Sequence, residues 1–149
     1  MARKAFFSFH YQRDLWRVNV VRNSAVVDGV SAAGFHDASL WEEARRKGDA
    51  AIKRLIDDGL GDTTVTVVLI GAQTASRKYV SYEIEQNVAR GNGIFGVKIN
   101  EIKDREGQTD APGIVPDALI RTRAPVYKYE YGKLGQWVEQ AYQAAHPKG

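Results

Sequence analysis

The stretch "TVTVVLIG", residues 64–71, decides the fold class. From Val65 to Ile70 it is β-branched or apolar almost without interruption, which is typical of a strand buried on both faces. Strands of this kind occur in parallel sheets, because the crossover helices that join parallel strands cover both faces of the sheet. The stretch therefore predicts an α/β domain built on a central, mostly parallel sheet.

On either side of this strand, short apolar runs alternate with patterns that have helical spacing. The other expected strands are "KAFFSF" (4–9), a short edge strand at 34–36, "GIFGVKI" (93–99) and "PVYKYEY" (125–131). The expected helices carry apolar stripes at Leu15, Val18 and Val21, at Ile52, Leu55 and Ile56, at Val80, Ile84 and Val88, and at Leu134, Trp137, Val138 and Ala141. About five strands and four or five helices then form one domain over residues 1–149. Its expected core includes Phe7, Val67, Leu69, Ile84, Val97 and Trp137.

Local signals predict where these helices begin and end. A side-chain oxygen can accept from the free amides of a first turn, and glycine accommodates the left-handed backbone that follows a last turn. The expected N-caps are Asp14, Ser39 and Ser76, and the expected terminating glycines are Gly59 and Gly91. Residues 100–117 are polar and contain glycine and proline, which predicts a long surface loop.

Composition excludes several classes of protein. The chain has no cysteine, which excludes disulfides and thiolate metal sites and favours the reducing cytoplasm. No apolar run approaches the ~20 residues that cross a bilayer, and no secretory signal is expected. The 21 basic and 18 acidic residues are interleaved, as in "EEARRKGD" (42–49), so neither nucleic acid nor a membrane is expected as a partner.

In a sheet of this kind, ligands bind beyond the carboxyl ends of the strands. The loop after the first strand supplies Ser8, His10, Tyr11 and Asp14. No nucleophile-elbow pattern surrounds Ser8, so a loop that lines a ligand pocket is favoured over a catalytic triad. The histidines, His10, His36 and His146, lack metal-ligand spacing, so no metal is expected.

A receiver-type phosphoacceptor domain has the same architecture and is disfavoured. It needs an acidic cluster after the first strand and an aspartate after the third. The corresponding strand ends here read Phe7-Ser8-Phe9 and Leu69-Ile70-Gly71.

The helix within "SRKYVSYEIEQN", residues 76–87, carries two carboxylates. Val80, Ile84 and Val88 define its expected buried side, and Glu83 and Glu85 lie on opposite flanks, each roughly 100° from the centre. Periodicity does not choose between them. Without further information, a glutamate on a helix flank is most often a solvated charge.

Four segments together resemble the TIR-like domains of bacterial Thoeris anti-phage defence systems, the ThsB proteins. They are "FFSFHYQRDLWRVNVVRN" (6–23), "GDAAIKRLIDDGL" (48–60), "TVTVVLIGAQTASRKYVSYEIEQNVARGNGIFGVKI" (64–99) and "VYKYEYGKLGQWVEQAY" (126–142). The resemblance covers nearly the whole chain. It implies a flavodoxin-like TIR fold.

The resemblance also implies an activity, the cleavage of NAD at the bond to nicotinamide. NAD is then the substrate, and no separate cofactor is implied. The implied product is a cyclic ADP-ribose-type second messenger, made after a phage-derived trigger, which activates a separate effector protein.

The resemblance also implies roles for the residues that match the TIR pattern Ser-x-x-Trp-x-x-x-Glu. This pattern matches Ser76, Tyr79 in place of tryptophan, and Glu83, and so selects Glu83 as the catalytic residue. The substrate-binding residues expected with it are Ser8, Phe9, His10, Tyr11, Ser76 and Tyr79.

Two questions stay open at this point. The alternative to an enzyme is a TIR-like interaction or scaffold module that turns over nothing. TIR enzymes commonly self-associate, and Tyr127, Tyr129 and Tyr131 are candidates for such a contact. The competing interpretation of these tyrosines is an edge strand packed on the last helix.

Overall fold

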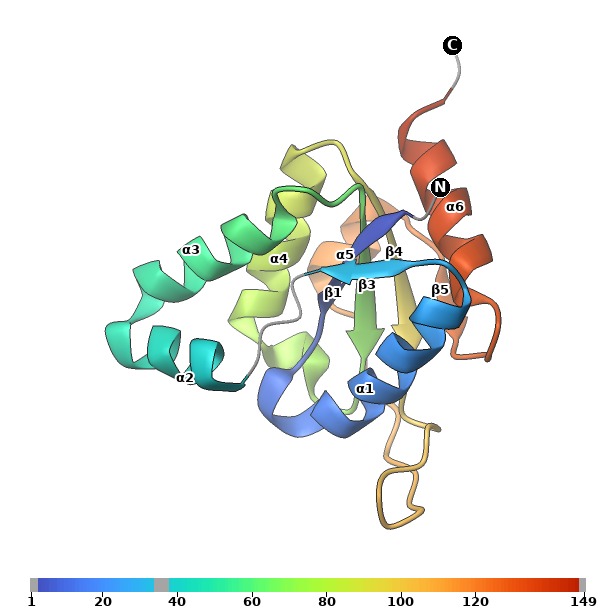
Figure 1. The fold of residues 1–149 in the computed structure, drawn as a ribbon, viewed down its shortest axis with the longest axis horizontal. Coiled ribbons are helices and arrows are strands. Elements are labelled where there is room, and N and C mark those ends of the chain that lie inside the picture. Colours follow the sequence, from blue (N-terminus) through green and yellow to red (C-terminus); the bar gives the residue numbers. More distant parts are fainter. Residues whose placement is uncertain (1–2, 34–37, 148–149) are drawn as a thin grey trace.

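The fold is centred on a parallel sheet of five strands, in a computed structural model that describes residues 3–33 and 38–147 (Figure 1). The strands are β1 (Lys4–Ser8), β2 (Ser31–Ala33), β3 (Val65–Ile70), β4 (Gly93–Lys98) and β5 (Val126–Lys128). Their spatial order is β2-β1-β3-β4-β5, and every neighbouring pair is parallel. This is the flavodoxin-like order, so the predicted fold class is confirmed.

The strand that decided the prediction lies at the centre of the sheet. All six residues of β3 are buried, and Val67 pairs with Phe7 of β1 and with Phe95 of β4. Helices cover both faces of β3, which is why its sequence shows no alternation of apolar and polar residues.

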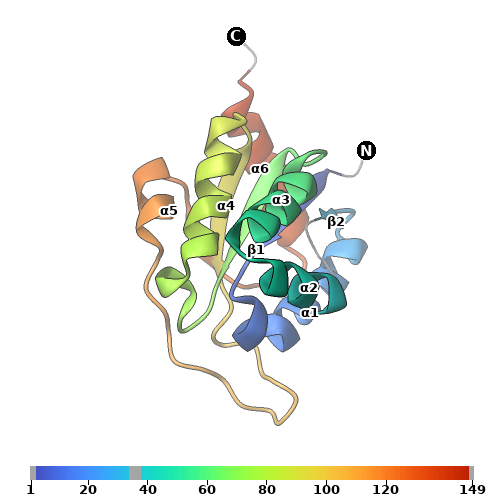
Figure 2. The same ribbon diagram turned by 90° about the vertical axis from the view of Figure 1, so that its left-hand side faces the viewer.

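Two helices cover one face of the sheet and three cover the other (Figure 1). The first layer contains α1 (Tyr11–Val27) and α6 (Leu134–Ala145). The second contains α3 (Asp49–Leu60), α4 (Lys78–Ala89) and α5 (Asp117–Thr122), and α2 (Ala38–Lys47) packs on α3. Figure 2 shows α3, α4 and α5 side by side in that second layer. The six residues predicted for the core are all buried.

Several predicted helix ends are wrong. Asp14 lies inside α1, whose N-cap is His10, and Ser76 belongs to a short 3-10 turn (Thr74–Ser76) ahead of α4. Gly59 lies within α3, which ends one residue later. The helix expected before it is two helices, because Gly48 between them has a φ of 107°, a backbone angle that few other residues adopt.

The edges of the sheet also differ from the prediction. The first edge strand, β2, ends before the expected range 34–36, which lies outside the described residues, as does His36. Residues 100–116 form the expected loop, and α5 follows it unpredicted. Figure 2 shows this loop extending past the carboxyl ends of the strands.

Arg17 of α1 forms hydrogen bonds that hold the 100–116 loop against the first helix. Its side chain is only 9% exposed and donates from Nε to the Ile102 carbonyl at 2.6 Å and from Nη2 to the Gln108 carbonyl at 2.9 Å. Asp104 and Asp110 lie within ion-pair distance of the same guanidinium group. The loop therefore has a defined place beside the first helix.

The tyrosines near β5 mostly take part in packing. The Tyr127 ring stacks on Trp137 of α6 with the ring centres 4.4 Å apart, and the Tyr129 hydroxyl donates to Ser24 at 3.0 Å. Tyr131 is 69% exposed. Packing on the helix layer therefore accounts for Tyr127 and Tyr129, and of the three only Tyr131 offers an open aromatic surface.

Candidate functional site

A buried hydrogen bond joins the first strand to α4. The Ser8 hydroxyl, at the carboxyl end of β1, donates to Oε1 of Glu83 at 2.6 Å. Ser8 is fully buried and Glu83 is 7% exposed. Seventy-five positions separate them in the sequence, and the parallel sheet brings them together at its ligand-binding edge.

The buried side of α4 is turned relative to the predicted apolar stripe. It consists of Val80, Glu83, Ile84 and Asn87, whereas Val88 is 50% exposed. Asn87 is satisfied within the protein, since its side chain accepts from the Thr66 hydroxyl at 2.7 Å and donates to the Gly93 carbonyl at 3.1 Å. A polar residue thus occupies a core position. Because the buried side of α4 includes Asn87 instead of Val88, it also includes Glu83.

The environment of Glu83 disfavours its charged form. Burial raises the pKa of Glu83 from its ordinary value of 4.5 to about 8, and the hydrogen bond from Ser8 opposes that rise. Oε2, the other oxygen of this carboxyl, accepts no hydrogen bond from any residue that the structure describes. Within the described part of the chain, one oxygen of Glu83 is therefore held by Ser8 and the other has no hydrogen-bond donor.

His10 follows Ser8 by two residues and is the N-cap of α1. It is 7% exposed, and its Nδ1 accepts from the backbone amide of Arg13 at 3.3 Å. Burial, together with the positive charges of Arg77 and Arg13, lowers the pKa of His10. The ring is consequently neutral near pH 7 and carries its proton on Nε2, where it can donate a hydrogen bond.

Arg77 is a residue that the sequence analysis did not select. It is the N-cap of α4, and its positive charge acts on His10. A basic residue directly after the motif serine is the only signal in the sequence that points to it.

Tyr79 is directed toward α3. It packs against the cluster formed by α2, α3 and Phe6, and its hydroxyl donates to Asp49 at the start of α3 at 2.7 Å. Lys78 Nζ also contacts Asp49, at 2.9 Å. Asp49 therefore ties the first turn of α4 to α3.

The remaining predicted site residues have less defined surroundings. Phe9 is half-buried and packs on the core cluster that contains Phe7. Ser76 is exposed, and its hydroxyl donates to the Gln73 carbonyl at 2.9 Å. Tyr11 begins α1, but its side chain lies outside the described part of the chain.

A second buried carboxyl lies at the same edge of the sheet. Asp14 is 1% exposed, and neither of its oxygens has a hydrogen-bond partner among the described residues. A Cβ atom at Gly71 would overlap this carboxyl, so the glycine after β3 makes room for it. Burial is the main cause that raises the pKa of Asp14.

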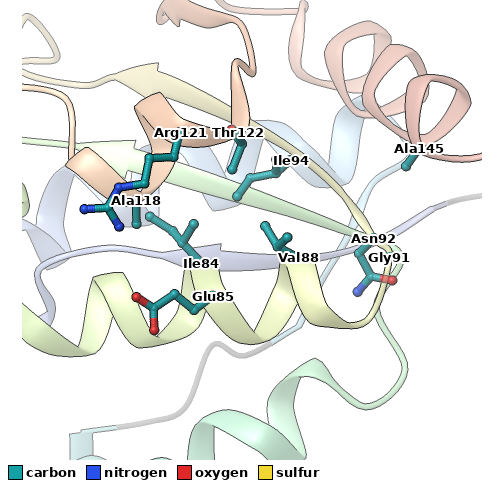
Figure 3. A pocket seen from close by; sticks show the side chains of 10 residues that line it. All are labelled: Ile84, Glu85, Val88, Gly91, Asn92, Ile94, Ala118, Arg121, Thr122 and Ala145. Atoms are coloured by element: carbon teal, nitrogen blue, oxygen red, sulfur yellow. The ribbon is translucent and has the colours of Figure 1, made fainter.

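Glu85 lies elsewhere. It is exposed and lines a cavity of about 550 Å³ between α4 and α5, together with Val88, Ala118 and Arg121 (Figure 3). Ser8, His10 and Glu83 do not line this cavity. Glu83 and Glu85 therefore face different parts of the molecule.

Among the described residues, no three histidine, aspartate or glutamate side chains gather in a way that would hold a metal ion. None of the described helices is both long enough and apolar enough to span a bilayer.

Comparison with known proteins agrees with the fold and with the family resemblance. Residues 6–104 match the family model described as Thoeris protein ThsB, TIR-like domain. The chain belongs to this family. The matched segment begins at Phe6 within β1, runs past the end of β4 and includes Ser8, His10 and Glu83.

A curated ThsB relative is named "Putative cyclic ADP-D-ribose synthase ThsB1" and comes from Bacillus cereus (strain MSX-D12). It is 52% identical over 118 residues, which make up 78% of this chain and 62% of the relative. The chain thus matches less than two thirds of that protein's length.

Proposed function

We propose that this ThsB-family domain cleaves NAD at the bond to nicotinamide and converts the ADP-ribose part into a cyclic ADP-ribose-type messenger. The observation that carries the proposal is the Ser8–Glu83 pair, a buried carboxyl held by a hydrogen bond at the carboxyl edge of the sheet, where ligands of such folds bind. The name of the Bacillus cereus relative supports the choice of product.

The chemistry needs one well-placed negative charge. When the bond from the ribose C1′ to nicotinamide breaks, its electron pair goes to the ring nitrogen and neutralises it, while positive charge develops at C1′. Glycoside hydrolysis passes through a similar oxocarbenium-like state, which carboxylates stabilise. An ionised Glu83 beside the ribose would stabilise this charge, and a fixed, partly desolvated charge of this kind contributes several kcal/mol.

The raised pKa of Glu83 suits such a site. The free protein holds a large share of this carboxyl in its neutral form near pH 7. NAD carries a positive charge on its nicotinamide ring, and a positive charge close to a carboxyl favours the ionised form. Binding of NAD would therefore favour the ionised form of Glu83, which is the form that stabilises the developing positive charge.

The neighbouring residues have supporting roles in this proposal. Phe9, Tyr11 and Tyr79 supply aromatic surface to the nucleotide, and His10 and Ser76 supply polar contacts. After nicotinamide has left, a nucleophile within the same bound molecule attacks C1′ and closes the ring. The product then reaches a separate effector protein, and a phage-derived component starts the reaction.

The test is release of nicotinamide from NAD, measured with the pure protein and in lysates of phage-infected cells that express it. We expect nicotinamide and a nucleotide with the mass of cyclised ADP-ribose, identified by mass spectrometry. The infected lysate is included because an enzyme that awaits a trigger is silent in isolation. If neither sample yields an NAD-derived product, the domain is an interaction module.

A further inference from the structure

Ser8 is placed to serve Glu83 more directly than it serves a substrate. It is the last residue of β1, a strand paired on both sides, and it stands opposite Val68 of β3. Its side chain is fully enclosed, and its hydroxyl proton is directed to the Glu83 carboxyl at 2.6 Å. A hydroxyl has only one proton to donate, so the same proton is not available to a nucleotide.

We propose that Ser8 is a positioning residue for Glu83, whose hydroxyl fixes one carboxylate oxygen and leaves the other to face the ribose. A donated hydrogen bond favours the charged form of a carboxyl over the neutral form. Ser8 thus holds Glu83 in place and also helps it to ionise against the cost of burial. The catalytic part of this inference rests on the proposed function, whereas the effect of Ser8 on Glu83 does not.

Among the residues that the structure describes, no other group has an equivalent effect on Glu83. Within that part of the chain, burial and the Ser8 hydrogen bond are the two causes that act on its pKa. The charged and titratable side chains on α4, at its two caps, on the elements packed against it and at the start of α1 are His10, Lys4, Asp49, Lys53, Arg54, Asp57, Asp58, Arg77, Lys78, Tyr79, Tyr82, Glu85, Arg90, Lys98, Asp117 and Arg121. Tyr79 and Tyr82 donate their hydroxyls to Asp49 and Asp57 of α3 and are occupied there.

The first experiment measures the ionisation of Glu83 in the protein without NAD. Carbon-13 NMR of labelled glutamate side chains, titrated from pH 5 to 10, follows each carboxyl, and the signal absent from Glu83→Gln belongs to Glu83. In Ser8→Ala we expect the midpoint of Glu83 to move upward by about one pH unit or more, because a charge-assisted hydrogen bond is lost. An unchanged or lower midpoint overturns the proposal.

The second experiment measures kcat/KM for NAD against pH, since this ratio reports the ionisation of the free enzyme. Activity of the wild type should rise with pH and level off above about 8. Ser8→Ala should show the same rise displaced to higher pH, with a loss of about tenfold at pH 7 that is largely recovered at pH 9.5.

A direct contact between Ser8 and the nucleotide gives a different result. It would raise KM at every pH and leave the midpoint of the rise in place, and that outcome overturns the positioning role. If neither the pure protein nor the lysate of phage-infected cells releases nicotinamide, the proposed function fails, while the NMR titration still decides whether Ser8 controls Glu83.

Discussion

Two glutamates that stand two positions apart on α4 have opposite surroundings. Glu83 is enclosed and bonded to Ser8, whereas Glu85 is exposed beside the cavity next to α5. Glu83→Gln keeps the shape of the side chain and its acceptor oxygen but removes the charge opposite C1′. We expect this variant to lose nicotinamide release by at least a hundredfold, in line with the loss of several kcal/mol of electrostatic stabilisation.

The matched control is Glu85→Gln, which makes the same chemical change on the same helix. It should retain most of the activity, because Glu85 does not reach the Ser8 edge of the sheet. Both variants are compared with the wild type by nicotinamide release and by far-ultraviolet circular dichroism. Similar losses of activity in the two variants would show that the helix, and not the Glu83 charge, is what the reaction requires.

Periodicity did not distinguish these two residues, for a physical reason. The apolar stripe suggested that Val88 is buried, but Val88 is half exposed and the polar Asn87 takes the inner position. An asparagine in the core is indistinguishable from a surface residue until its partners, Thr66 and Gly93, are known. The family motif selected Glu83, but the serine partner and the nearby Arg77 required the three-dimensional arrangement.

At the scale of elements, Arg17 shows how a helix holds a long loop. Its guanidinium group donates to two loop carbonyls from a buried position, and hydrogen bonds from charged groups contribute about 1.5–3 kcal/mol. Arg17→Gln should therefore lower the free energy of unfolding by about 2–3 kcal/mol, measured by urea denaturation.

Arg13 provides the comparison within the same helix. It pairs with Asp110 at 2.7 Å but is exposed, and exposed ion pairs contribute about 0–1 kcal/mol. Arg13→Gln should thus change the free energy of unfolding by less than about 1 kcal/mol. Equal losses in both variants would mean that the shared ion pair with Asp110, and not the donation to carbonyls, holds the loop.

The elements themselves were predictable to different degrees. Strand β3 was clear because burial on both faces removes polar residues from its sequence. The break at Gly48 was not recognised, because the expected N-cap Ser39 lies before it and the predicted stripe of Ile52, Leu55 and Ile56 lies after it, so the two were joined into one helix. The six-residue helix α5 buries only Ala118 and Leu119, which is too few positions to give a recognisable period.

At the scale of the whole molecule, the site makes the folded state sensitive to pH. The pKa values of Glu83 and Asp14 are raised by burial, so folding favours their neutral forms. Between the ordinary and the folded pKa the native state binds more protons than the unfolded state, and stability falls as the pH rises. His10 acts in the opposite sense below its ordinary pKa, because its neutral form is the one favoured by folding.

Comparing Glu83→Gln with the wild type isolates the contribution of one carboxyl. The stability that the wild type gains from a neutral Glu83 is complete below pH 4.5 and is lost by about pH 8. The rise in the pKa of Glu83 on folding corresponds to roughly 4–5 kcal/mol of the free energy of unfolding, at ~1.4 kcal/mol per pKa unit. The glutamine variant has no such loss, so its melting temperature should match the wild type near pH 4.5 and exceed it by on the order of 10 °C at pH 8.5. Differential scanning calorimetry across this range measures the difference, and a gap that stays constant with pH would show that Glu83 is already ionised in the free protein.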